Sequence, residues 1–140
     1  IATVTGTTGM LAVELFLTPE RPPVKELALR PHNSGHFTIE GCVTSQFEQH
    51  LRAILGMPLG LPSLIAPSVA TFNVIGQADG VDPRTRLARV LEVPGAHVHL
   101  YGKLPAPGRK LGHVTVCGQD PGPVREAARL ADATLEGRPS

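Results

Sequence analysis

Two alternating segments separated by a proline-rich stretch constrain the fold of this chain more than any other feature. Residues 11–18 place leucine or valine at every second position, and residues 24–30 alternate around Leu27 and Leu29. This periodicity is typical of β-strands. The intervening sequence TPERPP predicts a turn, so we expect an antiparallel hairpin whose turn is centred near Glu20.

The remaining elements should be short, because glycine and proline are frequent. The chain has 15 glycines and 14 prolines among its 140 residues, which favours short elements joined by many turns. Residues 44–56 predict an amphipathic helix that Thr44 or Ser45 caps, with Glu48 completing a capping box and Gly56 ending the helix. Its apolar stripe is predicted to comprise Phe47, Leu51, Ile54 and Leu55.

A proline- and glycine-rich connector, residues 57–67, follows this helix and is the best candidate for a boundary between two lobes. The predicted elements beyond it are strands at 68–75, 97–103 and 109–117 and helices at 83–91 and 120–135. The apolar side of the last helix should comprise Val124, Ala127, Ala128, Ala131 and Leu135.

These patterns predict an α+β chain. We expect residues 1–58 to form a first domain and residues 59–140 a small mixed α/β carboxyl-terminal lobe, with residues 138–140 fraying.

Charge and composition argue against several functional classes. The net charge of +1, one tyrosine and no tryptophan give no support for nucleic-acid binding. No apolar run is long enough to span a membrane, and no signal-peptide pattern is present. Cys42 and Cys117 lie in apolar contexts without metal-ligand spacing. We therefore expect two buried, reduced thiols and a cytoplasmic protein.

Two carboxylates are predicted to meet across the first hairpin. With its turn centred near Glu20, Glu14 lies opposite Glu26, on the face that also carries Arg30. Like charges directly across a strand pair are destabilising, by roughly 0.2–1 kcal/mol. A divalent cation would remove that cost, since Mg²⁺ is usually held by one or two carboxylates together with substrate phosphates. Two solvated glutamates on an open sheet face are the alternative.

Three cations are predicted to gather at the second hairpin. With a turn centred near Ala106, Lys103 faces Arg109, and Lys110 is adjacent. Such a cluster can hold a phosphate, although a solvated hairpin tip is the commoner outcome.

Histidines accompany this second hairpin. His97, His99 and Tyr101 share one face, and His113 should lie near His99. Packed neutral imidazoles are favoured over a metal site, because no ligand set with standard spacing is present.

The segment after the first hairpin concentrates hydrogen-bonding side chains. Arg30, His32, Asn33, Ser34 and His36 fall within seven positions around a proline and a glycine. An arginine at such a bend can bind a small planar anion bidentately, and a histidine can exchange a proton near neutral pH. The alternative is a polar loop in which Asn33 and Ser34 cap the turn and His36 is structural.

Three stretches carry a family resemblance. AVELFLT (12–18), the long segment ELALRPHNSGHFTIEGCVTSQFEQHLRAILGMPLG (26–60) and HLYGK followed by PGRKLGHV (99–114) resemble N5-carboxyaminoimidazole ribonucleotide synthetase, an ATP-grasp family of purine biosynthesis. The likeness runs in order over nearly the whole chain. It implies a ligase in which ATP phosphorylates bicarbonate to carboxyphosphate. The exocyclic amine of 5-aminoimidazole ribonucleotide is then carboxylated, and ADP and phosphate are released.

The resemblance also implies roles for individual residues. Glu14 and Glu26 look like ligands of the Mg²⁺ or Mn²⁺ that bridges the ATP phosphates, with Lys25 and Glu26 on the nucleotide side. Arg30 and His32 look like the catalytic groups at the bicarbonate position.

Further roles follow from the same likeness. Lys103 resembles the family's lysine near these substrates, and Asn33 and Ser34 look like substrate-binding residues. Arg109 and Lys110 resemble the clamp on the ribonucleotide phosphate.

This chain also departs from the family pattern. Lys25 stands where the family usually has asparagine, Leu29 stands where it has proline, and the hairpin loop lacks the expected glycine.

The chain resembles only the last two-fifths of such an enzyme, without a counterpart of the adenine pocket or the glycine-rich lid. We therefore expect a homodimeric parent enzyme, an inactive isolated chain, and exposed apolar surface where the missing half would pack. The alternative is a non-enzymatic or degenerate fragment that acts as a weak anion- or metal-binding or dimerisation module.

Overall fold

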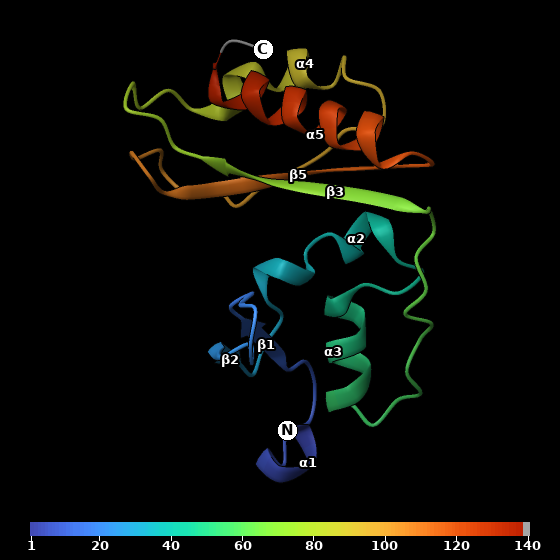
Figure 1. Cartoon of the computed structure of the whole chain (residues 1–140). Helices are drawn as coiled ribbons and strands as arrows, with labels where there is room; N and C mark the ends of the chain where they lie inside the picture. Colours follow the sequence, from blue (N-terminus) through green and yellow to red (C-terminus); the bar gives the residue numbers. More distant parts are fainter. Residues whose placement is uncertain (139–140) are drawn as a thin grey trace. The chain divides into compact units, whose positions relative to one another are not determined.

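A computed structural model describes residues 1–138, which separate into two compact units (Figure 1). The first unit comprises residues 1–65 and the second begins at Ala66. This division falls in the connector 57–67, where the sequence predicts a boundary; the 1–58 and 59–140 domain assignment itself stays a prediction. In the described part of the chain, no helix is long and apolar enough to cross a membrane.

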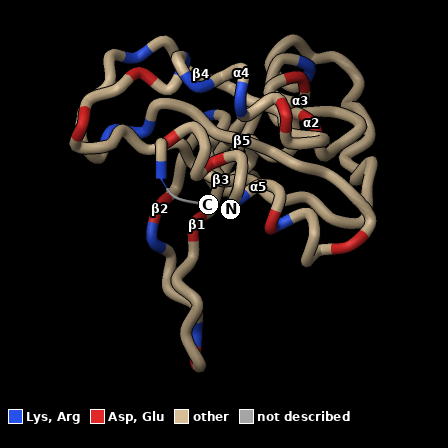
Figure 2. Tube along the Cα trace, turned by 90° about the horizontal axis from the view of Figure 1, so that it is seen from above, with Lys and Arg blue, Asp and Glu red and all other residues tan. Residues whose placement is uncertain are grey.

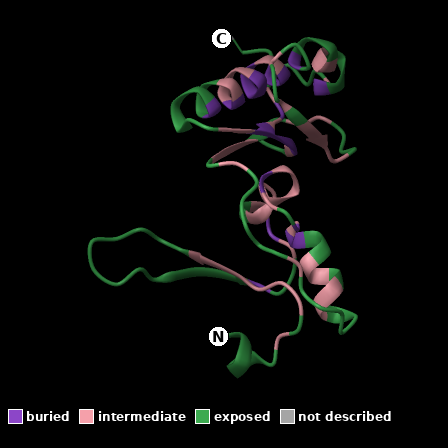
Figure 3. Ribbon diagram, turned by 90° about the vertical axis from the view of Figure 1, so that its right-hand side faces the viewer, coloured by how far each residue is buried: buried purple, intermediate pink, exposed green. Residues whose placement is uncertain are grey.

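The first unit begins with a short helix, α1 (Ala2–Thr5), and the predicted hairpin of β1 (Ala12–Leu15) and β2 (Val24–Ala28). The register confirms the predicted pairing of Glu14 with Glu26. The next pair is Leu15 with Val24, so Lys25 is the extra residue of a β-bulge. Both strands are shorter than predicted, and the turn beyond them is exposed (Figure 3).

Three short elements follow the hairpin: a 3₁₀ turn η1 (Asn33–Gly35), α2 (Thr38–Gly41) and α3 (Gln46–Ile54). Ser45 caps α3, since its Oγ accepts a hydrogen bond from the Glu48 backbone N–H at 3.2 Å. The Glu48 carboxylate accepts instead from Arg52, at 2.9 Å from its Nε. The predicted apolar stripe is exposed: Phe47, Leu51, Ile54 and Leu55.

The second unit is a three-stranded antiparallel sheet covered on one face by a helix (Figure 1). Its strands are β3 (Ser68–Ile75), β4 (His97–Leu100) and β5 (Lys110–Gly118), in the order β3-β5-β4. The first of them has the predicted bounds. The predicted helix over 83–91 is instead a 3₁₀ turn, η2 (Pro83–Arg86), followed by α4 (Leu87–Val90). The covering helix is α5 (Pro121–Glu136).

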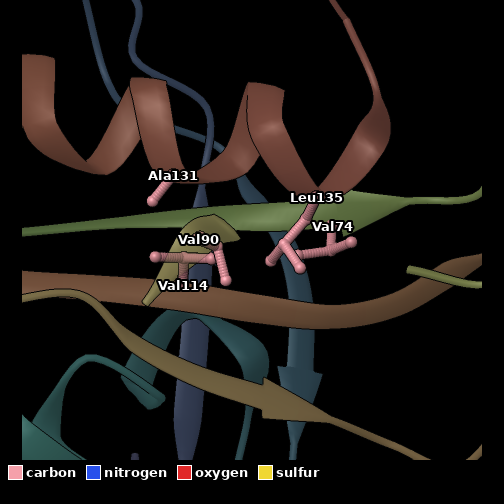
Figure 4. Close-up of a cluster of buried hydrophobic side chains, with 5 residues drawn as sticks. All are labelled: Val74, Val90, Val114, Ala131 and Leu135. Atoms are coloured by element: carbon pink, nitrogen blue, oxygen red, sulfur yellow. The ribbon is translucent and has the colours of Figure 1, made fainter. Parts of the chain in front are cut away.

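The core of the second unit lies between the sheet, α4 and α5. Val74, Val90, Val114, Ala131 and Leu135 form one buried cluster (Figure 4). A second cluster comprises Val116, Val124 and Ala128. The predicted apolar side of α5 is therefore confirmed, with Ala127 half-buried at its margin.

An ionic network of two buried carboxylates and one exposed arginine closes the end of α5. Arg138 pairs with Asp132 at 2.6 Å and with Glu136 at 2.5 Å. Burial, and then the neighbouring Glu136, raise the pKa of Asp132 to about 6. The predicted fraying therefore does not reach Arg138, while residues 139 and 140 lie outside the described part of the chain.

The prediction of two buried thiols was wrong, because Cys42 and Cys117 are each only half-buried. Burial is still sufficient to raise the pKa of the Cys42 thiol.

Candidate functional site

Glu14 and Glu26 project together from the first hairpin. They occupy paired positions of β1 and β2, and one oxygen of each lies within 4.8 Å of the other and of a ring nitrogen of His32. Both carboxylates are partly exposed, with 26% of the Glu14 side chain and 45% of the Glu26 side chain accessible. Two adjacent oxygen ligands open to solvent fit a hard cation such as Mg²⁺.

Lys25 contacts this acidic pair from within the hairpin. Its Nζ lies 2.8 Å from Oε2 of Glu14, and Figure 2 shows acidic and basic residues next to one another on β2. The hydrogen bond from the ammonium group, together with the negative charge of Glu14, raises the pKa of Lys25. The bulge makes this contact possible, because it re-aims a side chain that would otherwise alternate away from Glu26.

Because the Lys25 ammonium group competes with a cation for Glu14, replacing it should strengthen metal binding. We expect Lys25→Asn to lower the dissociation constant for Mn²⁺ by about two- to fivefold, the range that one exposed ion pair supports. The measurement is a Mn²⁺ titration monitored by the electron paramagnetic resonance of the unbound ion. Lys25→Arg, which keeps the charge, should bind as the unaltered chain does. Equal affinity of Lys25→Asn and the unaltered chain would exclude this competition.

His32 lies against the same carboxylates. Its Nε2 is 3.4 Å from Oε1 of Glu14 and 3.9 Å from Oε1 of Glu26, and the residue is only 8% exposed. The other ring nitrogen, Nδ1, accepts a hydrogen bond from the Ser34 backbone N–H at 3.3 Å and lies 3.0 Å from the Ser34 hydroxyl. The ring is therefore held on both edges.

Arg30 lies at the open side of the site. Its Nη2 is 3.9 Å from Oε1 of Glu26, and its Nη1 donates to the Pro31 carbonyl at 3.1 Å. The side chain is largely exposed, so it can turn toward a small anion beside the carboxylates. The predicted gathering of two acids, a guanidinium and an imidazole is found, while their catalytic roles stay predictions.

Asn33 and Ser34 lie in the 3₁₀ turn η1, which directly follows His32 in the sequence. Ser34 contacts His32, as described above, and the Asn33 Oδ1 is buried with no hydrogen-bond partner among the described residues. The buried Gln46, which holds this turn, was missed by sequence reasoning. A glutamine at the first position of a helix is ordinarily a surface residue, and nothing in the sequence marks it as buried.

The other predicted site residues belong to the second unit, in the loop between β4 and β5 and at the first residue of β5. The Lys103 Nζ lies 5.4 Å from the centre of the Tyr101 ring and donates to the Lys110 carbonyl at 3.4 Å. Arg109 donates from Nη1 to the Leu104 carbonyl at 3.0 Å. All three cations are thus gathered at one turn, as predicted, and anion binding there stays a prediction.

The histidines of the same sheet pack together. His99 and His113 are paired across β4 and β5, with ring centres 4.6 Å apart. The Tyr101 hydroxyl lies 2.8 Å from Nδ1 of His113. The predicted stacking of imidazoles is therefore found.

Comparison with known proteins assigns this arrangement to a class. Residues 1–47 match the ATP-grasp domain, and residues 70–127 match the phosphoribosylaminoimidazole carboxylase C-terminal domain. The N5-carboxyaminoimidazole ribonucleotide synthase of Corynebacterium ammoniagenes is 51% identical over 140 residues, covering 94% of this chain and 33% of that protein.

Solved structures of similar proteins give the same assignment. The phosphoribosylaminoimidazole carboxylase ATPase subunit from Aquifex aeolicus has a TM-score of 0.83 at 38% identity, covering 96% of this chain and 40% of that one. N5-carboxyaminoimidazole synthase from Aspergillus clavatus, solved in complex with ADP and 5-aminoimidazole ribonucleotide, has a TM-score of 0.79 at 38% identity. The alignment covers 92% of this chain and 35% of the Aspergillus clavatus protein.

The fold and these matches define the end of an ATP-grasp domain followed by a carboxylase-type carboxyl-terminal domain. The chain belongs to the N5-carboxyaminoimidazole ribonucleotide synthetase family. It corresponds to the carboxyl-terminal portion of these proteins. It spans about a third of the length of the curated relatives that it matches. The resemblance found in the sequence is thereby confirmed.

Proposed function

We propose that this chain is part of a cytoplasmic, homodimeric ligase that uses ATP and bicarbonate to carboxylate 5-aminoimidazole ribonucleotide to its N5-carboxy derivative. The observation that carries the proposal is the juxtaposition of Glu14, Glu26, Arg30 and His32 in the first unit. The reaction gathers a nucleotide polyphosphate, bicarbonate and a short-lived acyl phosphate in one place. Such a site needs a cation and fixed hydrogen-bond donors where negative charge accumulates.

Glu14 and Glu26 are the residues that would hold Mg²⁺. When bound there, the ion would offset the charge of the ATP phosphates. Two neighbouring side chains would contact the reacting groups. The exposed Arg30 guanidinium offers a planar pair of donors to bicarbonate, and His32 offers its Nε2 edge at the same side of the hairpin.

The second unit would bind the ribonucleotide. Arg109 and Lys110 offer charge to its phosphate, and Lys103 offers an ammonium group to the reacting anions. Support comes from the relative from Aspergillus clavatus, which was solved with ADP and 5-aminoimidazole ribonucleotide.

The chain on its own is proposed to be inactive. The exposed apolar residues of α3 and the small share of the relatives' length that it spans support this part of the proposal.

The direct test is ADP release that depends on bicarbonate and 5-aminoimidazole ribonucleotide, measured on the full-length protein containing this chain. Arg30→Ala and Lys103→Ala should each lower the rate by at least about tenfold, since each removes a cation from a site of developing negative charge. Arg129→Ala, which removes a surface arginine paired with Glu126, serves as the control and should leave the rate unchanged. Full activity in Arg30→Ala or Lys103→Ala would remove that residue from the site.

A further inference from the structure

Gln46, the first residue of α3, is buried beside the segment that carries His32. It is only 3% exposed, and its amide makes three hydrogen bonds. The amide oxygen accepts from the His32 backbone N–H at 2.9 Å, and the amide nitrogen donates to the His32 carbonyl at 2.8 Å. The nitrogen also lies 2.8 Å from Nδ1 of His36. Because a backbone N–H can only donate, the orientation of the amide is fixed, and one side chain holds both backbone polar groups of His32.

Close packing supports this fixed geometry. A Cβ added at Gly35 would lie 2.5 Å from the amide oxygen of Gln46, so a side chain at that position would have to displace the Gln46 amide. The Thr38 hydroxyl donates to the Gly35 carbonyl at 2.6 Å and accepts from the Gln46 backbone N–H at 2.9 Å. The turn and the start of α3 are therefore locked to each other through neighbouring contacts.

The turn that Gln46 holds places the Ser34 backbone N–H against the His32 ring. The Ser34 backbone N–H donates to Nδ1 at 3.3 Å, so in the neutral ring Nδ1 has a lone pair and Nε2 carries the hydrogen. Nε2 is the atom that faces Glu14 at 3.4 Å. A ring nitrogen that carries a hydrogen cannot coordinate a metal. In this tautomer His32 is a hydrogen-bond donor beside the carboxylates, and it is not a third metal ligand.

We propose that Gln46 is a positioning residue that holds His32 in the Nε2–H tautomer, with the donor edge of the ring directed at the Glu14 and Glu26 site. The inference rests on the proposed function, in that His32 acts beside bicarbonate. Its test reads the ring proton and needs no turnover. A failure of the proposed catalysis would therefore leave the result on Gln46 intact.

The experiment compares two volume-conserving variants of the ¹⁵N-labelled chain. Gln46→Met removes the two bonds to the His32 backbone and the contact with Nδ1 of His36. Gln49→Met is the matched control, because Gln49 makes the same pair of backbone bonds to Gly60, at 2.9 and 2.7 Å. Long-range ¹H–¹⁵N spectra in mildly alkaline buffer report which ring nitrogen of His32 carries the hydrogen.

The unaltered chain and Gln49→Met should show one tautomer, with the hydrogen on Nε2. Gln46→Met should show signals averaged between the two tautomers. An unchanged tautomer in Gln46→Met, or equal averaging in Gln49→Met, would overturn the proposal. If Gln46→Met fails to fold, Gln46→Glu decides, because it keeps the acceptor for His32 and loses both donors. Its tautomer should then be mixed, and a pure Nε2–H ring in that variant would also overturn the proposal.

Discussion

Replacing Leu135 with alanine should lower the free energy of unfolding of the second unit by about 3 kcal/mol, within the range of roughly 2–5 kcal/mol for buried leucines. Leu135 is fully buried among Val74, Val90, Val114 and Ala131 (Figure 4). Truncation removes apolar contacts and leaves a cavity where α5 meets the sheet. This loss is a large share of the free energy of unfolding, because a domain of this size has a small net stability.

The measurement is urea unfolding monitored by tyrosine fluorescence. Tyr101 is the single tyrosine of the chain, which has no tryptophan, so its emission reports on the second unit alone. Leu104→Ala is the control, since Leu104 is 76% exposed; its unfolding free energy should change by less than about 0.5 kcal/mol. A similarly small change in Leu135→Ala would mean that this side chain is not part of a packed core.

Pairing register was the most predictable part of the fold. A turn centre near Glu20 aligns Glu14 with Glu26, and a centre near Ala106 aligns His99 with His113; both pairings are present. Register follows from turn position because the side-chain period of a strand is two. Strand ends were less predictable, since the prolines after Leu17 have no backbone N–H to donate to the ladder.

The helical segment 83–91 illustrates a limit of periodicity. Asp82 accepts a hydrogen bond from the Arg84 backbone N–H at 2.9 Å, and η2 begins at Pro83. A 3₁₀ turn therefore comes first, and only one turn of α-helix follows. The apolar positions alone do not distinguish these two geometries.

The charged residues of the candidate site could be predicted from the sequence. The residue that holds the His32 backbone, Gln46, could not. Glu14, Glu26, Arg30 and His32 are marked by their residue types and by the hairpin register. Gln46 is marked by nothing in the sequence, because its importance lies in three hydrogen bonds that form only after the turn at 33–35 has folded.

The second large effect concerns the acidic pair. We expect Glu14→Gln together with Glu26→Gln to weaken Mn²⁺ binding by at least about a hundredfold, because loss of ligands should exceed the 10–100-fold cost of losing their supporting contacts. Glutamine has nearly the same size as glutamate but carries no charge. Stability without metal should not fall, since the substitutions also remove like charges paired across the hairpin.

A matched control removes the same charge elsewhere. Glu48 and Glu126 each pair with a surface arginine, Arg52 and Arg129 respectively. The variant carrying Glu48→Gln and Glu126→Gln has the same net charge as the site variant. It should retain Mn²⁺ binding at the hairpin, which would separate coordination from a general effect of charge.

The most direct measurement is paramagnetic broadening of the amide signals of the ¹⁵N-labelled chain by substoichiometric Mn²⁺. Broadening should centre on Glu14, Glu26 and His32, persist in the charge-matched control, and disappear in the site variant. Broadening centred elsewhere, or unchanged at the hairpin after both glutamates are replaced, would contradict the assignment of this pair as the cation site.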